Sequence, residues 1–89
     1  MYILHYKIKE LILYVKNNVR IARIQKDYTQ QELAEKVGVT RQTISLIEKG
    51  EYNPTLKLCL NICYAVNKGL DEVFWIDKEG ADENEKDYR

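Results

Sequence analysis

Four side chains between residues 41 and 46 have the types and spacing needed to contact the edges of nucleic-acid bases. Arg41 carries a planar fork of N–H donors that matches guanine, and Gln42 carries a donor and an acceptor that match adenine. Leu46, one helical turn after Gln42, can touch a thymine methyl group, and Ser45 can reach a base or a phosphate. The alternatives are a solvated helix face for Arg41 and Gln42, and packing on a neighbouring loop for Leu46.

Polar side chains on either side of this group suit contacts with phosphates. Amide and hydroxyl groups stand near the starts of two predicted helices, where backbone N–H groups also favour anions. A cation and two polar side chains follow the second helix and could contact the backbone of the duplex farther along. The predicted phosphate-binding residues are Gln30, Thr40, Thr43, Lys49, Tyr52 and Asn53.

Two helix-start signals with a glycine between them predict how these side chains are positioned. Thr29 is followed three residues later by a glutamate, the spacing of a capping box, and Thr40 is a second N-cap. Gly38 lies between them and can take the left-handed conformation that ends a helix. Helices 29–36 and 40–49, joined by so tight a turn, must cross steeply, which predicts a helix-turn-helix.

The rest of the chain is expected to bury the inner faces of this helix pair. Three further helices are predicted, and the apolar segments that flank them have the β-branched and aromatic character of strands. The fold class is therefore all-α with five helices, together with a small two-stranded antiparallel sheet. The additional helices are 17–26 (capped by Asn17 or Asn18), 56–66 and 70–74, and the strands are 13–16 and 73–77.

Two charged residues lie toward the inward sides of their predicted helices. Arg23 and Glu48 could form a partly buried, hydrogen-bonded pair that locks the first helix to the one bearing Arg41. Removal of one partner from such a pair leaves a charge that is costly to bury. The alternative is two independent surface charges.

The helix predicted over 56–66 is apolar almost all round, whereas a surface helix of a small monomer needs a single apolar stripe. One interpretation is a central core helix. The other is that a second face of this helix meets another copy of the chain. Under that interpretation a homodimer is expected, with Leu58, Ile62 and Trp75 at its interface.

The formal net charge is zero, but the charges are unevenly distributed. Residues 1–70 carry eleven Lys and Arg against six Asp and Glu, whereas residues 71–89 carry three against eight. A basic body that can face phosphates is therefore followed by an acidic stretch. The expected organisation is an N-terminal extension at 1–14, a helix-turn-helix domain at 15–77 and an acidic flexible tail at 78–89.

The first fourteen residues carry a separate hypothesis, which is that they are not part of the natural product and that Val15 is encoded by an alternative start codon. No stretch has the length to span a bilayer, and residues 2–15 lack the clean apolar centre and cleavage site of a signal peptide. A cytoplasmic location without membrane contact is therefore expected.

Nothing in the sequence indicates catalysis, a metal or a cofactor. His5 is the only histidine, which excludes a Ser-His-Asp set within the predicted domain, and the glycines form no phosphate-binding cluster. Cys59 and Cys63 share a helix face without further ligands nearby, so two buried free thiols are expected. No pocket for a small-molecule ligand is evident from the sequence.

The motifs together resemble the Cro/repressor-type (XRE-type) helix-turn-helix family over roughly residues 18–75. The similarity rests on segments 29–34, 37–45, 47–50 and 53–56, and on the ending 70–75. It is greatest to small members that resemble the cytolysin-operon repressor, whose five lambda-repressor-like helices are extended by a two-stranded sheet. This chain departs from the family pattern at Leu46, because that position is often polar in members of the family.

The resemblance implies a prokaryotic transcriptional repressor that binds double-stranded DNA as a homodimer on a palindromic operator. It places base reading at Arg41, Gln42, Ser45 and Leu46, phosphate contact around Gln30, Thr40 and Thr43, and an ion pair at Arg23 and Glu48. Two alternatives stay open. One is an antitoxin that binds a partner toxin and represses its own operon, and the other is a protein-interaction module on the same fold.

Overall fold

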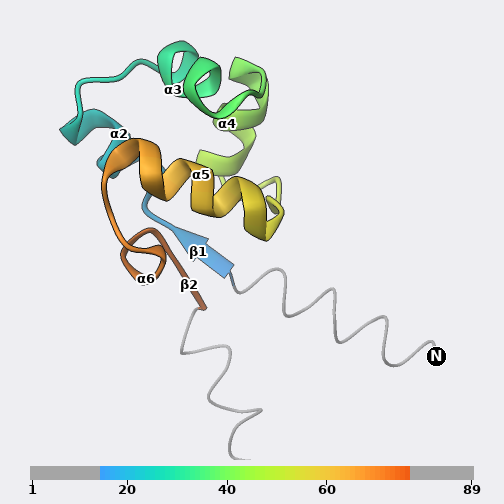
Figure 1. The fold of residues 1–89 in the computed structure, drawn as a ribbon. Helices are drawn as coiled ribbons and strands as arrows, with labels where there is room; N and C mark the ends of the chain where they lie inside the picture. Colours follow the sequence, from blue (N-terminus) through green and yellow to red (C-terminus); the bar gives the residue numbers. More distant parts are fainter. Residues whose placement is uncertain (1–14, 77–89) are drawn as a thin grey trace, which may run out of the picture.

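The computed structural model describes residues 15–76, which form a helical domain closed by one pair of short strands (Figure 1). Five helices and two strands are present within this range, as predicted. In chain order they are β1 (Val15–Asn17), α2 (Val19–Gln25), α3 (Gln30–Val37), α4 (Arg41–Glu48), α5 (Leu56–Val66), α6 (Leu70–Val73) and β2 (Phe74–Ile76). The predicted segments 1–14 and 78–89 lie outside the described residues.

The ends of α5 and α6 coincide with residues suited to capping a helix. The Thr55 side chain accepts a hydrogen bond from the Leu58 N–H, which satisfies a free donor in the first turn of α5. Asn67 ends α5 in the left-handed conformation at φ 59°. Gly69 precedes α6, and its N–H donates to the Glu72 carboxylate over 2.6 Å. Local sequence therefore determines where these two helices begin.

The first helix begins two residues later than the predicted start. Asn17 belongs to β1 instead, and its Oδ1 accepts a hydrogen bond from the Val19 N–H over 3.0 Å. Asn18 occupies the N-cap position without a side-chain capping bond. Strand pairing holds Asn17 extended, and helical geometry therefore starts only after Asn18.

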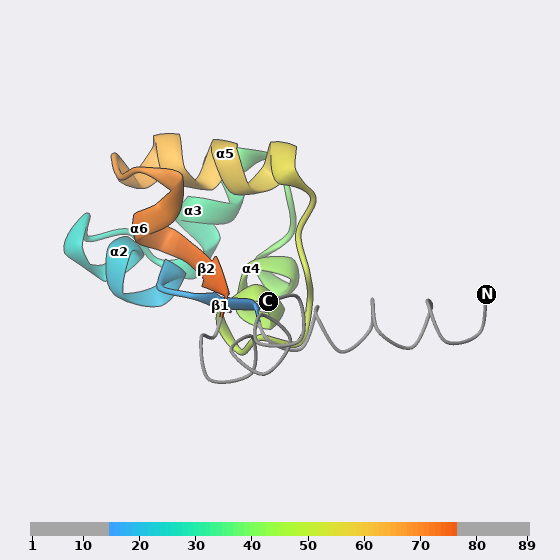
Figure 2. The same ribbon diagram turned by 90° about the horizontal axis from the view of Figure 1, so that it is seen from below.

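The two strands pair antiparallel, and Figures 1 and 2 both show them side by side. Val15 lies opposite Ile76, and Asn17 lies opposite Phe74. The Asn18 N–H then donates to the Val73 carbonyl over 2.7 Å, which continues the connection toward α2 and α6. The predicted pairing is confirmed, although the first two residues of the expected strand 13–16 lie outside the described range.

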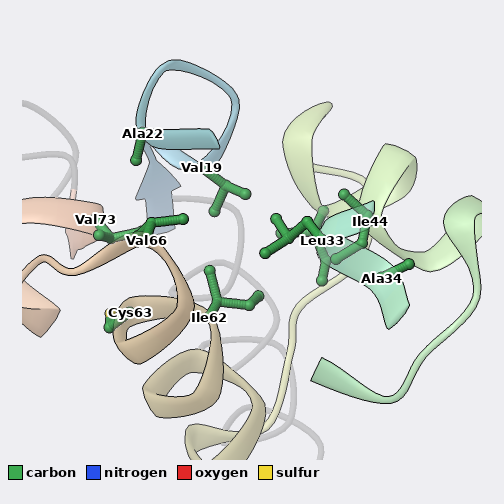
Figure 3. Close-up of a cluster of buried hydrophobic side chains, with 10 residues drawn as sticks. Val19, Ala22, Leu33, Ala34, Ile44, Ile62, Cys63, Val66 and Val73 are labelled. Carbon is green, nitrogen blue, oxygen red and sulfur yellow. The ribbon is translucent and has the colours of Figure 1, made fainter. Parts of the chain in front are cut away.

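A single buried cluster joins all five helices of the described range (Figure 3). Burying a Leu, Ile or Val side chain stabilises a fold by roughly 1.5–3 kcal/mol, so this cluster is the main source of cohesion. The cluster consists of Val19, Ala22, Leu33, Ala34, Ile44, Ile47, Ile62, Cys63, Val66 and Val73.

Within residues 15–76, no helix is long and apolar enough to cross a membrane.

Helix α5 is a core helix that also carries exposed apolar side chains. Ile62 has no exposed area, so its predicted role at a dimer interface is wrong, because the core of its own chain already covers it. By contrast, Leu56, Leu60 and Tyr64 are 64%, 49% and 89% exposed. These three are spaced four residues apart and therefore lie along one stripe of α5.

Candidate nucleic-acid interface

Helix α3 begins with the reciprocal capping pair that the sequence predicts. Thr29 Oγ1 accepts from the Glu32 N–H over 3.0 Å, and Glu32 Oε1 accepts from the Thr29 N–H over 2.8 Å. Leu33 and Ala34 are fully buried on the inner side of this helix. The cap and the buried face together set where α3 starts and which side it turns outward.

The turn between α3 and α4 depends on Gly38 and Thr40. Gly38 adopts a φ of 77°, which side-chain-bearing residues rarely take, and Val39 then donates its N–H to the Ala34 carbonyl. Thr40 caps α4 by accepting from the Thr43 N–H over 3.2 Å. The turn therefore brings the first residues of α4 close to the start of α3.

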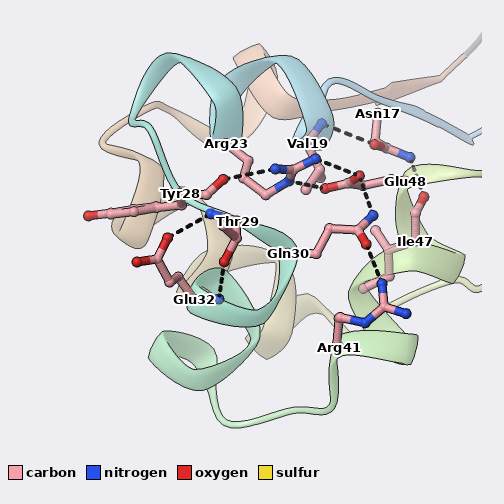
Figure 4. A network of polar contacts seen from close by, with 10 residues as sticks. All are labelled: Asn17, Val19, Arg23, Tyr28, Thr29, Gln30, Glu32, Arg41, Ile47 and Glu48. Atoms are coloured by element: carbon pink, nitrogen blue, oxygen red, sulfur yellow. Dashed lines mark hydrogen bonds and ion pairs between the residues drawn. The ribbon is translucent and has the colours of Figure 1, made fainter.

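An ion pair fixes α2 to the end of α4 (Figure 4). Arg23 Nε donates to Glu48 Oε2 over 2.7 Å, and Arg23 Nη2 donates to Glu48 Oε1 over 3.3 Å. A third donor, Arg23 Nη1, reaches the Tyr28 carbonyl over 2.8 Å. The side chains of Arg23 and Glu48 are only 11% and 5% exposed. This forked, nearly buried pair holds three segments at a fixed distance.

Gln30 connects this pair to the N-terminal end of α4. Its Nε2 donates to Glu48 Oε1 over 3.0 Å, and its Oε1 accepts from Arg41 Nη1 over 2.8 Å. A carboxylate only accepts and a guanidinium only donates, so both neighbours demand this one orientation of the amide. The Arg41 guanidinium is thus already held beside the start of α3.

Asn17 ties the strand pair to the same helix. Its Nδ2 donates to the Ile47 carbonyl over 2.8 Å, while its Oδ1 accepts from Val19, as described above. Figure 4 shows Asn17 and Arg23 on the same side of the ribbon, approaching the end of α4 from β1 and α2. The C-terminal end of α4 is therefore anchored by two independent side chains.

The predicted reading residues share the outer part of α4 but differ in exposure. Arg41 and Gln42 are exposed, whereas Ser45 and Leu46 are half-buried. The side chain of Leu46 is therefore partly covered by its own chain. Only the remaining part of Leu46 is free to touch a ligand.

The predicted phosphate contacts divide into two groups. Thr40 is exposed and Thr43 is half-buried, and their hydroxyl oxygens lie 3.0 Å apart. Lys49, Tyr52 and Asn53 are exposed, on the end of α4 and the loop that follows it. Gly50, with a φ of 76°, turns the chain between the two elements. The candidate interface therefore runs from the starts of α3 and α4 to the loop after α4.

Sequence reasoning missed the connecting roles of Gln30 and Asn17. Gln30 was expected to contact phosphate, and Asn17 was considered only as a helix cap. In addition, Gln30 bonds Glu48, 18 positions away, and Asn17 bonds Ile47, 30 positions away. For Gln30 a signal was available, because a nearly buried ion pair requires further hydrogen-bond partners.

The two cysteines of α5 are free and buried. Burial raises the pKa of the Cys59 thiol, with a further contribution from Cys63. Burial also raises the pKa of Cys63, with smaller contributions from the carboxylates of Asp71 and Glu72. Both thiols are therefore protonated near neutral pH and react slowly.

Comparison with known proteins places this geometry in a family. The profile of the helix-turn-helix family HTH_3 matches residues 19–73. The chain is 48% identical over 65 residues to an uncharacterized HTH-type transcriptional regulator of Bacillus subtilis, YgzD, which covers 73% of this chain and 98% of the relative.

Archaeal proteins are similar to a comparable degree. An uncharacterized HTH-type transcriptional regulator of Methanothermobacter thermautotrophicus is 45% identical over 64 residues. The match covers 71% of this chain and 93% of the relative. Another from Archaeoglobus fulgidus is 40% identical over 65 residues, covering 73% and 92%. The resemblance to Cro/repressor-type proteins is thereby confirmed. This chain belongs to the HTH_3 family of helix-turn-helix proteins.

Proposed function

We propose that this protein is a sequence-specific DNA-binding transcriptional regulator that reads bases with the N-terminal half of α4. The main support is the contact between Gln30 and Arg41, which holds a guanidinium at the start of α4 before any ligand arrives. Arg41 and Gln42 stand exposed at neighbouring positions, where a recognition helix contacts base edges. The names of the bacterial and archaeal relatives, all HTH-type transcriptional regulators, agree with this function.

The protein acts in this proposal as a homodimeric repressor on a palindromic operator. A two-fold symmetric dimer places two copies of α4 in successive major grooves, about 34 Å apart, so the half-sites lie one helical turn apart. Of the residues first expected at the dimer interface, Leu58 is half-buried and Trp75 is 45% exposed. Trp75 is the better candidate because nearly half of its surface is free to be covered by a second copy.

Arg41→Ala tests the proposed base contact on an operator selected from random DNA. Loss of one bidentate contact costs about 1–3 kcal/mol, and the preference at one base position of each half-site disappears. Because the contacted base is uncharged, the salt dependence changes little. Lys49→Ala, at a proposed phosphate contact, instead lowers affinity for all sequences and reduces the salt slope by about 0.9.

Fluorescence anisotropy at several salt concentrations, on the operator and its point variants, measures both effects. Arg20→Ala is the matched control, since Arg20 is exposed on α2 and makes no contact in the polar network. The proposed reading residues are wrong if Arg41→Ala binds the operator and its variants as the parent does. Absence of DNA binding even at low salt would contradict the function itself.

A further inference from the structure

A hollow of about 550 Å³ lies between the α2–α3 connection, the end of α3 and the C-terminal half of α5. Its walls combine cationic, aromatic and amide side chains. Tyr64, one of the aromatic walls, is 89% exposed, so the hollow opens directly to solvent. The lining residues are Lys26, Tyr28, Lys36, Asn61, Tyr64, Ala65 and Asn67.

The charge of this hollow is positive. Its lining contains two lysines and no carboxylate, and neither Lys26 nor Lys36 forms an ion pair within residues 15–76. Lys36 Nζ lies 4.8 Å from the centroid of the Tyr28 ring, an arrangement that holds the ammonium group at the wall. An anionic group would find two cations and several hydrogen-bond donors here.

Two nearby carboxylates are already engaged elsewhere. Glu32 and Glu35 line a smaller adjoining hollow together with Tyr28 and Lys36. The Glu32 carboxylate accepts from the Thr29 N–H, and the Glu35 carboxylate accepts from Gln31 Nε2 over 3.0 Å. Neither is within ion-pair distance of Lys36, so both lysines remain available to an outside anion.

The hollow does not belong to the candidate DNA surface. Figure 4 shows the Tyr28 ring extending away from Gln30 and Arg41, on the other side of the α3 start. The remaining walls come from the end of α3 and from α5, neither of which carries a proposed base-reading residue. A duplex lying on the start of α4 would leave this cationic hollow uncovered.

We propose that the hollow is the docking site of the acidic segment 77–89 of the same chain. That segment carries six Asp and Glu against three Lys and Arg, so its charge is opposite to that of the hollow. Its thirteen residues can extend about 43 Å from Ile76, well beyond the diameter of about 25 Å expected for a domain of this size. Because the hollow lies apart from the proposed DNA surface, docking there keeps the acidic segment away from that surface.

Nuclear magnetic resonance of the full chain tests this docking. The variant D82N/E83Q/E85Q neutralises the middle of the segment and leaves the domain unchanged. Relative to the parent, we expect backbone amide shifts at Lys36, Tyr64 and Asn67. The same shifts should appear when the parent is moved to about 0.5 M salt, where the Debye length falls to roughly 4 Å.

Two lysine variants complete the test. In the full chain, K36E should remove the difference between the parent and the neutralised segment, whereas K57E should preserve it, because Lys57 is exposed on α5 but does not line the hollow. Unchanged amides around the hollow would overturn the proposal, as would shifts concentrated at residues 41–46. Shifts that grow with protein concentration would also overturn it, since the segment would then come from another copy.

Discussion

At the scale of single residues, the nearly buried Arg23–Glu48 pair holds the candidate interface in position. Its carboxylate is shared between the Arg23 guanidinium and the Gln30 amide, and the other end of that amide meets Arg41. A chain of alternating donors and acceptors thus runs from α2 to the start of α4. The position of Arg41 is therefore coupled to a pair whose side chains are almost entirely covered.

Arg23→Ala should lower the free energy of unfolding by about 3 kcal/mol, because it leaves the Glu48 carboxylate nearly buried without its cation. The double variant Arg23→Met/Glu48→Met should recover most of that loss, since it removes both charges. Urea unfolding followed by circular dichroism measures the three proteins. Arg20→Ala, with an exposed side chain, should stay within about 0.5 kcal/mol of the parent. Equal destabilisation of the single and double variants would contradict the argument.

The raised pKa of Cys59 and Cys63 predicts weaker folding at alkaline pH. Their ordinary pKa is 9.0, and burial raises it in the folded chain. The unfolded chain therefore releases these protons first, so the thiols' contribution to stability is complete below pH 9 and declines as the pH rises through their folded pKa values.

Unfolding free energies measured between about pH 8 and pH 10.5 should fall more steeply for the parent than for Cys59→Ala/Cys63→Ala. The double variant serves as the control, because the two proteins differ only at these two thiols. Parallel curves would show that the thiols do not contribute to the slope.

The sequence predicted which side of its own helix a residue faces. It did not predict how much neighbouring elements cover that residue. The inward position of Arg23 and Glu48 on their own helices was enough to suggest that they meet. The cover on Leu46 and the burial of Ile62 depend on segments distant in the chain, which helical periodicity cannot reveal. Gln30 shows the same limit, because its two partners come from opposite ends of α4.

At the scale of elements, the turn between α3 and α4 was predictable because its chemistry is local. A Thr cap before each helix and a glycine between them leave few other conformations. The start of α2 was not predictable to the residue, since pairing with β2 holds Asn17 in a strand. Pairing with β2, which lies far along the chain, overrides the local preference of asparagine for a helix cap.

Gly38→Ala should destabilise the domain by about 1 kcal/mol through backbone strain alone. Gly38 has a φ of 77°, and an added Cβ would meet no atom within 4 Å, so no steric clash contributes. Gly38→Asn should cost less, because asparagine tolerates the left-handed conformation better. Urea midpoints at an unchanged m-value measure the difference. A Gly38→Ala variant as stable as the parent would contradict the strain argument.

At the scale of the whole molecule, exposed apolar side chains remain after the core is complete. Trp75 lies on β2, whereas Leu60 lies on the exposed stripe of α5, so the two residues represent different elements. Trp75 is 45% exposed and Leu60 is 49% exposed. A homodimer could bury either surface, and the proposed interface includes Trp75.

Trp75→Glu should convert the proposed homodimer to a monomer, because it places a charge in the apolar interface of that dimer. Sedimentation equilibrium measures the mass, and circular dichroism verifies that the variant is folded. Leu60→Glu is the matched comparison on α5 and should remain dimeric. Dissociation by Leu60→Glu, with a dimeric Trp75→Glu, would transfer the interface to α5.

The strand pair also determines how the domain responds to mechanical load. Val15 lies opposite Ile76, so the two ends of the described domain emerge side by side at the same end of the ladder. Tension applied between them opens the residue pairs one after another, as in a zipper, rather than shearing all of them at once. Asn17 lies in the last pair of this ladder, so complete opening of the strands would strain its bond to the Ile47 carbonyl and loosen that anchor of α4.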